Sequence, residues 1–278
     1  MFEADGGSRP QERYGEATQG NVVRFLAFEP EYPNSIYSCI VAARENARSV
    51  RETISSEMWE QINGMYLLVT AQNRKGLPEV LPEFCLQIRM ACHLFQGITQ
   101  DTMSHDEAWH FIQLGRRLER ADKTSRTLDV KYFILLPSVI DVGTPYDDVQ
   151  WTALLKSVTG FEMYRKKHGR IAPRNIVDFL VLDREFPRTI RHCLREAHES
   201  LHAITGTPMG SCVYPSERSL APLRAELDYT SVDRIISQGL HEYLDALQVR
   251  MNTIDDNLAL DFFAREPVTQ SATAGGNS

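Results

Sequence analysis

The sequence lacks the long apolar runs and short signatures that mark the commonest functional classes. No apolar stretch among its 278 residues approaches the roughly 18 that a membrane-spanning helix needs. The first twenty residues also lack the apolar core of a secretory signal. A Walker loop, a dinucleotide-binding fingerprint and a G-x-S-x-G nucleophile elbow are all missing. We therefore expect no membrane association and no cofactor.

Basic charge and cysteine are also scarce. The chain has 37 acidic and 30 basic side chains, which give a formal net charge of −7. A general nucleic-acid binder normally shows a basic face, so we expect no nucleic-acid partner. The five cysteines are an odd number and form no C-x-x-C pair. This pattern predicts reduced thiols in a cytoplasmic protein.

What the sequence does contain is helical periodicity between two irregular ends. Residues 1–19 and 264–278 are polar and glycine-containing, and we expect both to be disordered or irregular. Across 20–263 apolar residues recur at spacings of three and four, which is typical of amphipathic helices. The pattern predicts helices over residues 33–58, 83–97, 107–130 and 230–263. The expected fold is an all-α helical bundle.

An internal repeat is also visible. Residues 21–50 align without gaps on residues 175–204, and ten of the thirty positions are identical, including Cys39 and Cys193. Chance similarity between two amphipathic helices would not also match the N-x-V-x-F-L sequence that precedes them. We interpret the bundle as two related repeats.

Four charged residues form a strip along the predicted helix at 107–130: Glu119, Asp122, Arg126 and Asp129. Spacings of three and four place them within reach of one another. Such a strip can line a groove, orient a ligand amine or hold a metal, with Arg117 or Arg120 binding a carboxylate or phosphate. The alternative is a solvated ladder of salt bridges, each worth a few tenths of a kcal/mol.

Several motifs around this helix occur together in one known family. The stretches are LGRRLERADKTSRTLDVKY, RENARSVRETISSEMWEQIN, FLVLDREFPRTI and GLHEYLDALQ. Together they closely resemble the alpha-E domain family, a predicted all-helical bacterial domain marked by a Glu-Arg pair, here Glu119 and Arg120. The resemblance covers about residues 20–263. Arg44 and Glu45, in the RENARSV segment, are further candidate binding residues.

The resemblance also implies partners. Members of this family are typically encoded beside a circularly permuted ATP-grasp protein, often with a transglutaminase-like protease nearby. The chain is therefore expected to be a non-catalytic helical partner or substrate-presenting module of an amide- or peptide-forming ligase. An enzyme with its site on the 107–130 helix is the alternative.

The N-terminal part of the chain differs from the family pattern. Family members usually begin with a Glu-Arg helix ahead of the segment matched by residues 21–50. The repeat spacing places that helix before Met1, so the first repeat is expected to be incomplete at its N-terminus. We expect such a bundle to expose apolar surface.

One further motif matches H-E-x-x-H, the helix signature of zinc proteases, at residues 198–202. His198 and His202 would bind zinc, and Glu199 would activate a water. At the same positions the first repeat has Arg44-Glu45-Asn46-Ala47-Arg48, which favours a partly exposed helix flank instead. We therefore expect no metal, and keep a zinc peptidase as a minor alternative.

Overall fold

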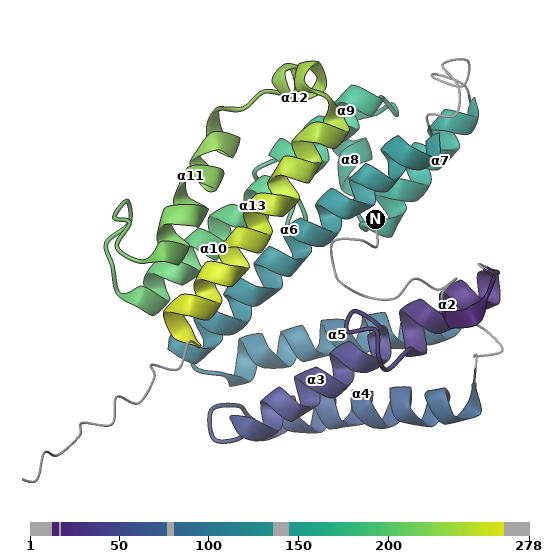
Figure 1. The fold of residues 1–278 in the computed structure, drawn as a ribbon, viewed down its shortest axis with the longest axis vertical. Helices are drawn as coiled ribbons and strands as arrows, with labels where there is room; N and C mark the ends of the chain where they lie inside the picture. Colours follow the sequence, from purple (N-terminus) through teal and green to yellow (C-terminus); the bar gives the residue numbers. More distant parts are fainter. Residues whose placement is uncertain (1–12, 17, 77–80, 136–144, 264–278) are drawn as a thin grey trace, which may run out of the picture. The chain divides into compact units, whose positions relative to one another are not determined.

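The computed structural model describes residues 13–16, 18–76, 81–135 and 145–263. Throughout these ranges the regular structure is α-helix, which confirms the predicted all-α fold (Figure 1). The chain divides into two compact units, Met1–His105 (unit 1) and Asp106–Ser278 (unit 2). The predicted helical region 20–263 thus consists of two units, and the predicted tail 264–278 lies outside the described residues.

Unit 1 is built from helices with polar caps. Its described helices are α2 (Gln19–Phe28), α3 (Ile36–Ser49), α4 (Ser56–Lys75) and α5 (Leu81–Thr102). The side chains of Thr18, Ser35 and Ser55 each accept a hydrogen bond from a backbone N–H of the following first turn. Helix α3 packs on α2 and α4, and α4 packs on α5. One cluster of buried side chains in unit 1 consists of Ala27, Phe28, Ile40, Val69, Phe84 and Ile88.

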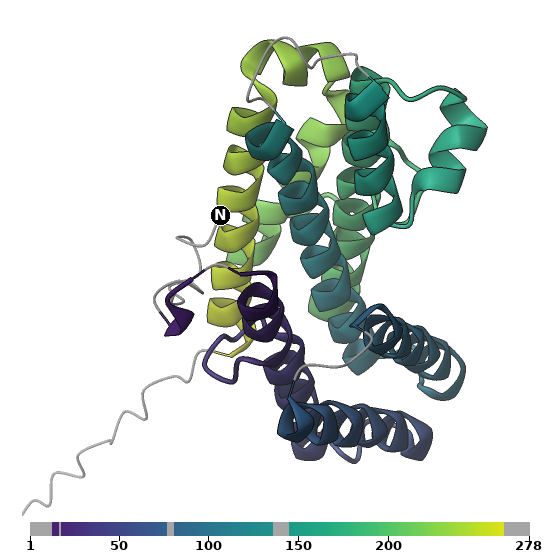
Figure 2. The same ribbon diagram turned by 90° about the vertical axis from the view of Figure 1, so that its right-hand side faces the viewer.

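Unit 2 is a four-helix bundle with additional helices. The bundle consists of α6 (Glu107–Leu135), α10 (Ile190–Thr205), α11 (Pro215–Tyr229) and α13 (Leu240–Phe262). Each of these helices packs against the next, and α13 closes the ring against α6. Figure 2 shows α6 and α13 running alongside each other. Leu118, Leu194, Leu223 and Leu247 contribute one buried side chain from each helix to the shared core.

The remaining helices of unit 2 are α7 (Pro145–Ser157), α8 (Phe161–His168), α9 (Pro173–Leu182) and α12 (Val232–Gln238). A buried ion pair joins α7 to α6, because Lys131 Nζ lies 2.6 Å from Asp147 Oδ1. The same ammonium lies 4.7 Å from the ring centroid of Trp151. No helix in the described part of the chain is both long and apolar enough to cross a membrane.

Two predicted helices are each divided in the structure. The predicted helix 33–58 is wrong as a single element, because α3 ends at Ser49 and Ser55 caps a new helix by accepting a hydrogen bond from the Met58 N–H at 3.1 Å. The predicted helix 230–263 is interrupted at Gly239, whose φ of +101° is incompatible with a continuous right-handed helix. The predicted helices 83–97 and 107–130 are present but extend further in α5 and α6.

The two segments aligned in sequence also share local contacts. Helices α2 and α9 both have ten residues. Phe25 stacks on Tyr32 at 4.4 Å in unit 1, and Phe179 stacks on Phe186 at 4.9 Å in unit 2. The matched thiols, Cys39 and Cys193, donate to the carbonyls of the matched prolines, each at 3.5 Å.

The residues before α2 and α9 correspond in the same way. Arg13 pairs with the buried carboxylate of Glu29, and Lys167 pairs with the buried carboxylate of Asp183. Arg13 and its neighbour Tyr14 have helical conformation, although residues 1–19 were expected to be disordered or irregular; residues 1–12 and 17 lie outside the described residues. These shared contacts support a duplication, which stays a prediction.

Candidate functional site

The Glu-Arg pair lies near the middle of α6, between α10 and α13. Leu114, Leu118 and Ala121 of α6 are buried in the core of unit 2. Successive residues of an α-helix are about 100° apart around its axis, so Glu119 and Arg120 leave α6 in different directions. They belong to two separate groups of side chains, one beside α10 and one beside α13.

Beside α10, Arg120 reaches the segment that starts this helix. Its Nη1 donates to the Pro187 carbonyl at 3.4 Å, the same oxygen to which Cys193 Sγ donates. One turn further along α6, the Thr124 hydroxyl donates to the Arg188 carbonyl at 2.8 Å. These bonds satisfy carbonyls that precede α10 and have no helical donor of their own, so they hold α6 against the start of α10.

Three arginines of α6 approach α10 together, and we call Arg116, Arg117, Arg120 and Arg195 the arginine cluster. Arg117 Nη2 lies 3.5 Å from Glu196 Oε2, and Arg195 Nη2 donates to the other oxygen of that carboxylate at 2.8 Å. Burial, followed by the charges of Arg117 and Arg120, lowers the pKa of Arg116 to about 10. Burial also lowers the pKa of Arg120.

Glu196 is the carboxylate within this cluster. Burial raises the pKa of Glu196, but the hydrogen bond from Arg195 and the charge of Arg117 outweigh it, so the net shift is downward. One carboxylate is thus shared between an arginine of α6 and an arginine of α10.

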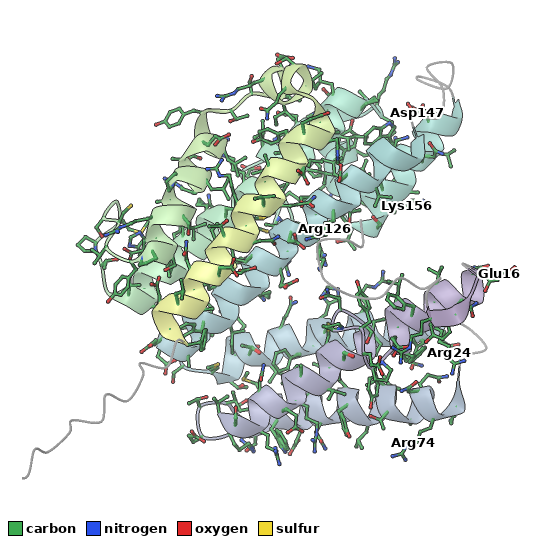
Figure 3. All side chains as sticks on the ribbon, viewed as in Figure 1. Glu16, Arg24, Arg74, Arg126, Asp147 and Lys156 are labelled. Carbon is green, nitrogen blue, oxygen red and sulfur yellow. The ribbon has the colours of Figure 1, made fainter. Side chains whose placement is uncertain are left out.

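Beside α13, the side chains of the predicted strip mostly form local pairs. Arg126, which Figure 3 labels, donates through Nε to both carboxylate oxygens of Asp122, at 2.8 and 3.0 Å. Asp129 Oδ1 lies 2.9 Å from His241 Nδ1 of α13. Glu119 is 70% exposed and lies 3.8 Å from Lys123. The strip therefore contains ion pairs along α6 and a contact from Asp129 across to α13.

Asp255 of α13 adds another carboxylate to the α13 side of α6. Loss of hydration beside neighbouring protein atoms, together with the negative charges of Glu119, Asp122 and Asp256, raises the pKa of Asp255 to about 6. The residue is still exposed to solvent. An accessible carboxyl group that titrates near neutral pH is suited to proton transfer.

The structure brings only some of the predicted site residues together. Glu119, Asp122, Arg126 and Asp129 share the α13 side of α6, as predicted. Arg117 and Arg120 lie beside α10, so the predicted combination of the strip with either arginine in one site does not form.

Arg44 and Glu45 belong to unit 1, where Arg44 Nε donates to Asn63 at 2.9 Å and its guanidinium lies 4.4 Å from the Tyr66 ring centroid. Arg44 also lies 5.6 Å from the ring centroid of Trp59.

The H-E-x-x-H match falls on α10, where its two histidines are buried. Their Nε2 atoms are 3.2 Å apart. Glu199, the residue that would activate a water, is 54% exposed and lies 3.8 Å from Arg195. Among the described residues no group of three or more His, Cys, Asp or Glu side chains is placed to hold a metal. The pair thus lacks the third protein ligand of a catalytic zinc site.

These histidines instead adjoin a buried polar network around Glu217. His202 Nδ1 lies 2.8 Å from Thr207 Oγ1, and both Thr205 and Thr207 donate to Glu217. Two backbone N–H groups, of Val213 and Tyr214, donate to its other oxygen at 2.7 and 3.1 Å. Burial raises the pKa of Glu217, but these hydrogen bonds outweigh it and lower the pKa to about 2.

Sequence reasoning did not find Arg116, Glu196, Asp255 or Glu217. Glu196 and Asp255 meet α6 only through tertiary packing, and no spacing in the sequence indicates that they lie beside it. Glu217 had only a partial signal: it follows Pro215 in the first turn of α11, where a capping box places Glu, but Tyr214 is not a usual N-cap residue.

Comparisons with known proteins agree with the helical structure. The model of one family, described as a predicted alpha-helical domain with a conserved ER motif, matches residues 2–263. Uncharacterized proteins of Mycobacterium bovis and Mycobacterium tuberculosis are each 21% identical to this chain over 267 residues. The aligned region covers 90% of this chain but only 28% of each relative. No solved structure matches the chain.

The family match therefore covers both units. Glu-Arg pairs occur in the sequence at 12–13, 119–120 and 217–218, and the pair at 119–120 lies in the centre of α6. On this evidence the chain belongs to the Alpha-E family.

Proposed function

We propose that this protein is a non-catalytic helical partner or substrate-presenting module of an ATP-grasp-type amide or peptide ligase. The observation that carries the proposal is the bond from Arg120 to the Pro187 carbonyl. Together with Thr124, it gives the Glu-Arg helix an internal role in holding α6 against α10. Glu119, the other member of the pair, is left exposed for an external contact.

The lengths of the relatives also support a module. This chain spans just over a quarter of the length of the curated relatives it matches. In those proteins a region of this kind is one part of a longer polypeptide, as expected for a domain that works beside others. By the resemblance, the partner is a circularly permuted ATP-grasp protein, with a transglutaminase-like protease as a second partner, and the complex is cytoplasmic.

Co-purification with the ATP-grasp protein tests this proposal. We expect Glu119→Arg to weaken the association while leaving the unfolding curve unchanged, because Glu119 is largely exposed. The matched control is Glu162→Arg on α8, which reverses a charge at another exposed position of unit 2. We expect Arg120→Gln to lower stability instead. If the two proteins do not associate, and ligase output is the same with and without this chain, the proposal is wrong.

A second candidate is an enzyme with its site on the α13 side of α6. The observation that favours it is the pKa of Asp255, raised to about 6 beside Glu119 and Asp122. Replacing Glu119 by Gln and Asp122 by Asn separates the two candidates. Intact folding and intact association with loss of ligase output supports a reactive site, whereas loss of the association itself supports the partner role. Lower stability with unchanged output supports a structural strip.

A further inference from the structure

The arginine cluster contains more positive charge than its neighbours neutralise. Arg116 Nη2 donates to Gln113, a neutral amide, and Arg120 donates to a neutral carbonyl. Arg117 and Arg195 share Glu196, and Arg195 also approaches Glu199 at 3.8 Å.

The arginine cluster also contains N–H donors that form no hydrogen bond. The Nε atoms of Arg116, Arg117 and Arg195 are buried and have no hydrogen-bond partner. Buried donors are normally paired, and each that is left unpaired reduces stability. Two of these donors belong to α6 and one to α10, so they line the interface between the two helices from both sides. We call this interface the seam.

Formation of the helix itself does not require these charges. In the aligned segment of unit 1, α3 begins with the same type of cap and the same thiol-to-carbonyl contact as α10. Yet the positions that correspond to Arg195 and Glu196 are occupied by Val41 and Ala42. Helix α3 forms without the charged side chains that α10 presents to α6, so the helix itself does not depend on these charges.

The seam is also open to solvent. The side chain of Arg195 is 41% exposed and that of Glu196 is 29% exposed, whereas that of Arg117 is 14% exposed. An anion approaching from solvent would meet Arg195 and Glu196 first and the α6 arginines behind them. Guanidinium groups bind carboxylates and phosphates through paired N–H donors, and they do so most strongly when partly desolvated.

The structure assigns an oxyanion-binding site to the seam between α6 and α10, in which Arg116, Arg117 and Arg120 of α6 and Arg195 of α10 bind a carboxylate or phosphate group. Glu196 occupies part of this site when the ligand is absent and competes with it. The inference goes beyond the proposed function, because a chain that associates with no ligase still binds the anion.

The test uses the full chain with inorganic phosphate and with succinate, in separate titrations at constant ionic strength set with potassium chloride. Isothermal calorimetry and backbone amide shifts report binding. We expect saturable binding of at least one of the two anions, with shifts centred on α6 and α10. Preference for phosphate identifies a phosphate site, and preference for succinate identifies a carboxylate site.

Two variants change the site in opposite directions. Arg116→Gln with Arg120→Gln removes two donors, and we expect the anion to bind about tenfold more weakly or not at all. Glu196→Gln removes the competing carboxylate, and we expect tighter binding than in the wild type. The matched control, Lys166→Gln with Arg170→Gln, removes two exposed charges near the end of α8 and leaves the affinity unchanged.

The Glu196→Gln variant keeps the inference testable if the double arginine variant does not fold. Absence of saturable binding by either anion in both the wild type and Glu196→Gln would overturn the inference. Equal weakening in the cluster variant and in the α8 control would also overturn it, because the effect would then be one of net charge alone.

Discussion

Glu217 shows how a single buried carboxylate can be kept ionised by neutral donors. Its side chain is 0% exposed, and two threonine hydroxyls and two backbone N–H groups donate to it. Each oxygen has its own pair of donors, so removal of the carboxylate leaves up to four groups without a partner. The nearby His198 is instead kept neutral, because burial disfavours its charged form.

We predict that Glu217→Ala destabilises unit 2 by about 3 kcal/mol, since buried donors lose their acceptor. Glu217→Gln should be milder, because the amide oxygen still accepts from one pair of donors. Urea unfolding followed by circular dichroism measures both changes. The control is Glu162→Ala at an exposed position of α8, where we expect no measurable change. Equal midpoints for Glu217→Ala and the control would contradict the assigned role.

His198 predicts an acid-dependent loss of stability. Burial, followed by the charge of His202, lowers its pKa from 6.5 to about 4. The unfolded chain therefore binds more protons than the folded one between these values, and stability falls as the pH drops through this window. Asp255 acts in the opposite sense, since its raised pKa favours the folded state as the pH falls through 6.

The comparison of wild type with His198→Gln isolates the histidine, because Asp255 is present in both proteins. We expect the difference in urea midpoint between them to change steadily from pH 6.5 to pH 4.5, above the window in which Glu217 becomes protonated. Replacement of the exposed His93 by Gln should not change the wild-type profile. Parallel profiles for wild type and His198→Gln would show that His198 is not held neutral.

At the scale of elements, periodicity predicted helices well and their ends less well. Leu114, Leu118 and Ala121 recur at spacings of four and three within the predicted helix 107–130, and all three are buried in α6. The apolar spacing over residues 33–58 is equally regular, yet these residues form two helices. The spacing continues across the short loop between α3 and α4, which ends at the N-cap residue Ser55. The site was predicted in part: helical spacing identifies which residues share a side of α6, but not that α10 and α13 separate its two sides.

Gly239 allows a direct test of the break between α12 and α13. A Cβ at this position would meet the Glu242 carboxylate, which can move aside, but the φ of +101° is strained for any other residue. We predict that Gly239→Ala destabilises the protein by about 2 kcal/mol. Gly115 is the matched control, because it lies inside α6 and a Cβ added there would have nothing within 4 Å.

Gly115→Ala should stabilise the protein by up to about 1 kcal/mol, since alanine is the better helix former. Thermal unfolding of the two variants and the wild type measures both changes in stability, the expected loss for Gly239→Ala and the expected gain for Gly115→Ala, in one experiment. A neutral or stabilising Gly239→Ala would mean that α12 and α13 can form one continuous helix.

At the scale of the whole molecule, the two units differ in the size of their cores. Among the described residues, six buried side chains form the core cluster of unit 1, whereas thirty form that of unit 2. Aligned positions differ accordingly: Leu26 is 42% exposed, while the corresponding Leu180 is 0% exposed. The apolar surface expected from an incomplete first repeat stays a prediction.

We predict that unit 1 unfolds at a lower temperature than unit 2, because hydrophobic burial is the main stabilising term and its core is smaller. Differential scanning calorimetry should show two transitions. Ile40→Ala should lower only the first, and Leu194→Ala only the second, each by roughly 3 kcal/mol in its own unit. A single transition that both variants shift equally would show that the units unfold as one.

The distribution of the tryptophans gives each unit its own fluorescence signal. Trp59 of unit 1 lies beside Arg44, and Trp151 of unit 2 is buried beside Lys131. The third tryptophan, Trp109, also belongs to unit 2. Replacement of Trp109 and Trp151 by Phe therefore leaves a fluorophore that reports on unit 1 alone. Replacement of Trp59 leaves the emission of unit 2, so the unfolding of each half can be recorded separately in the intact chain.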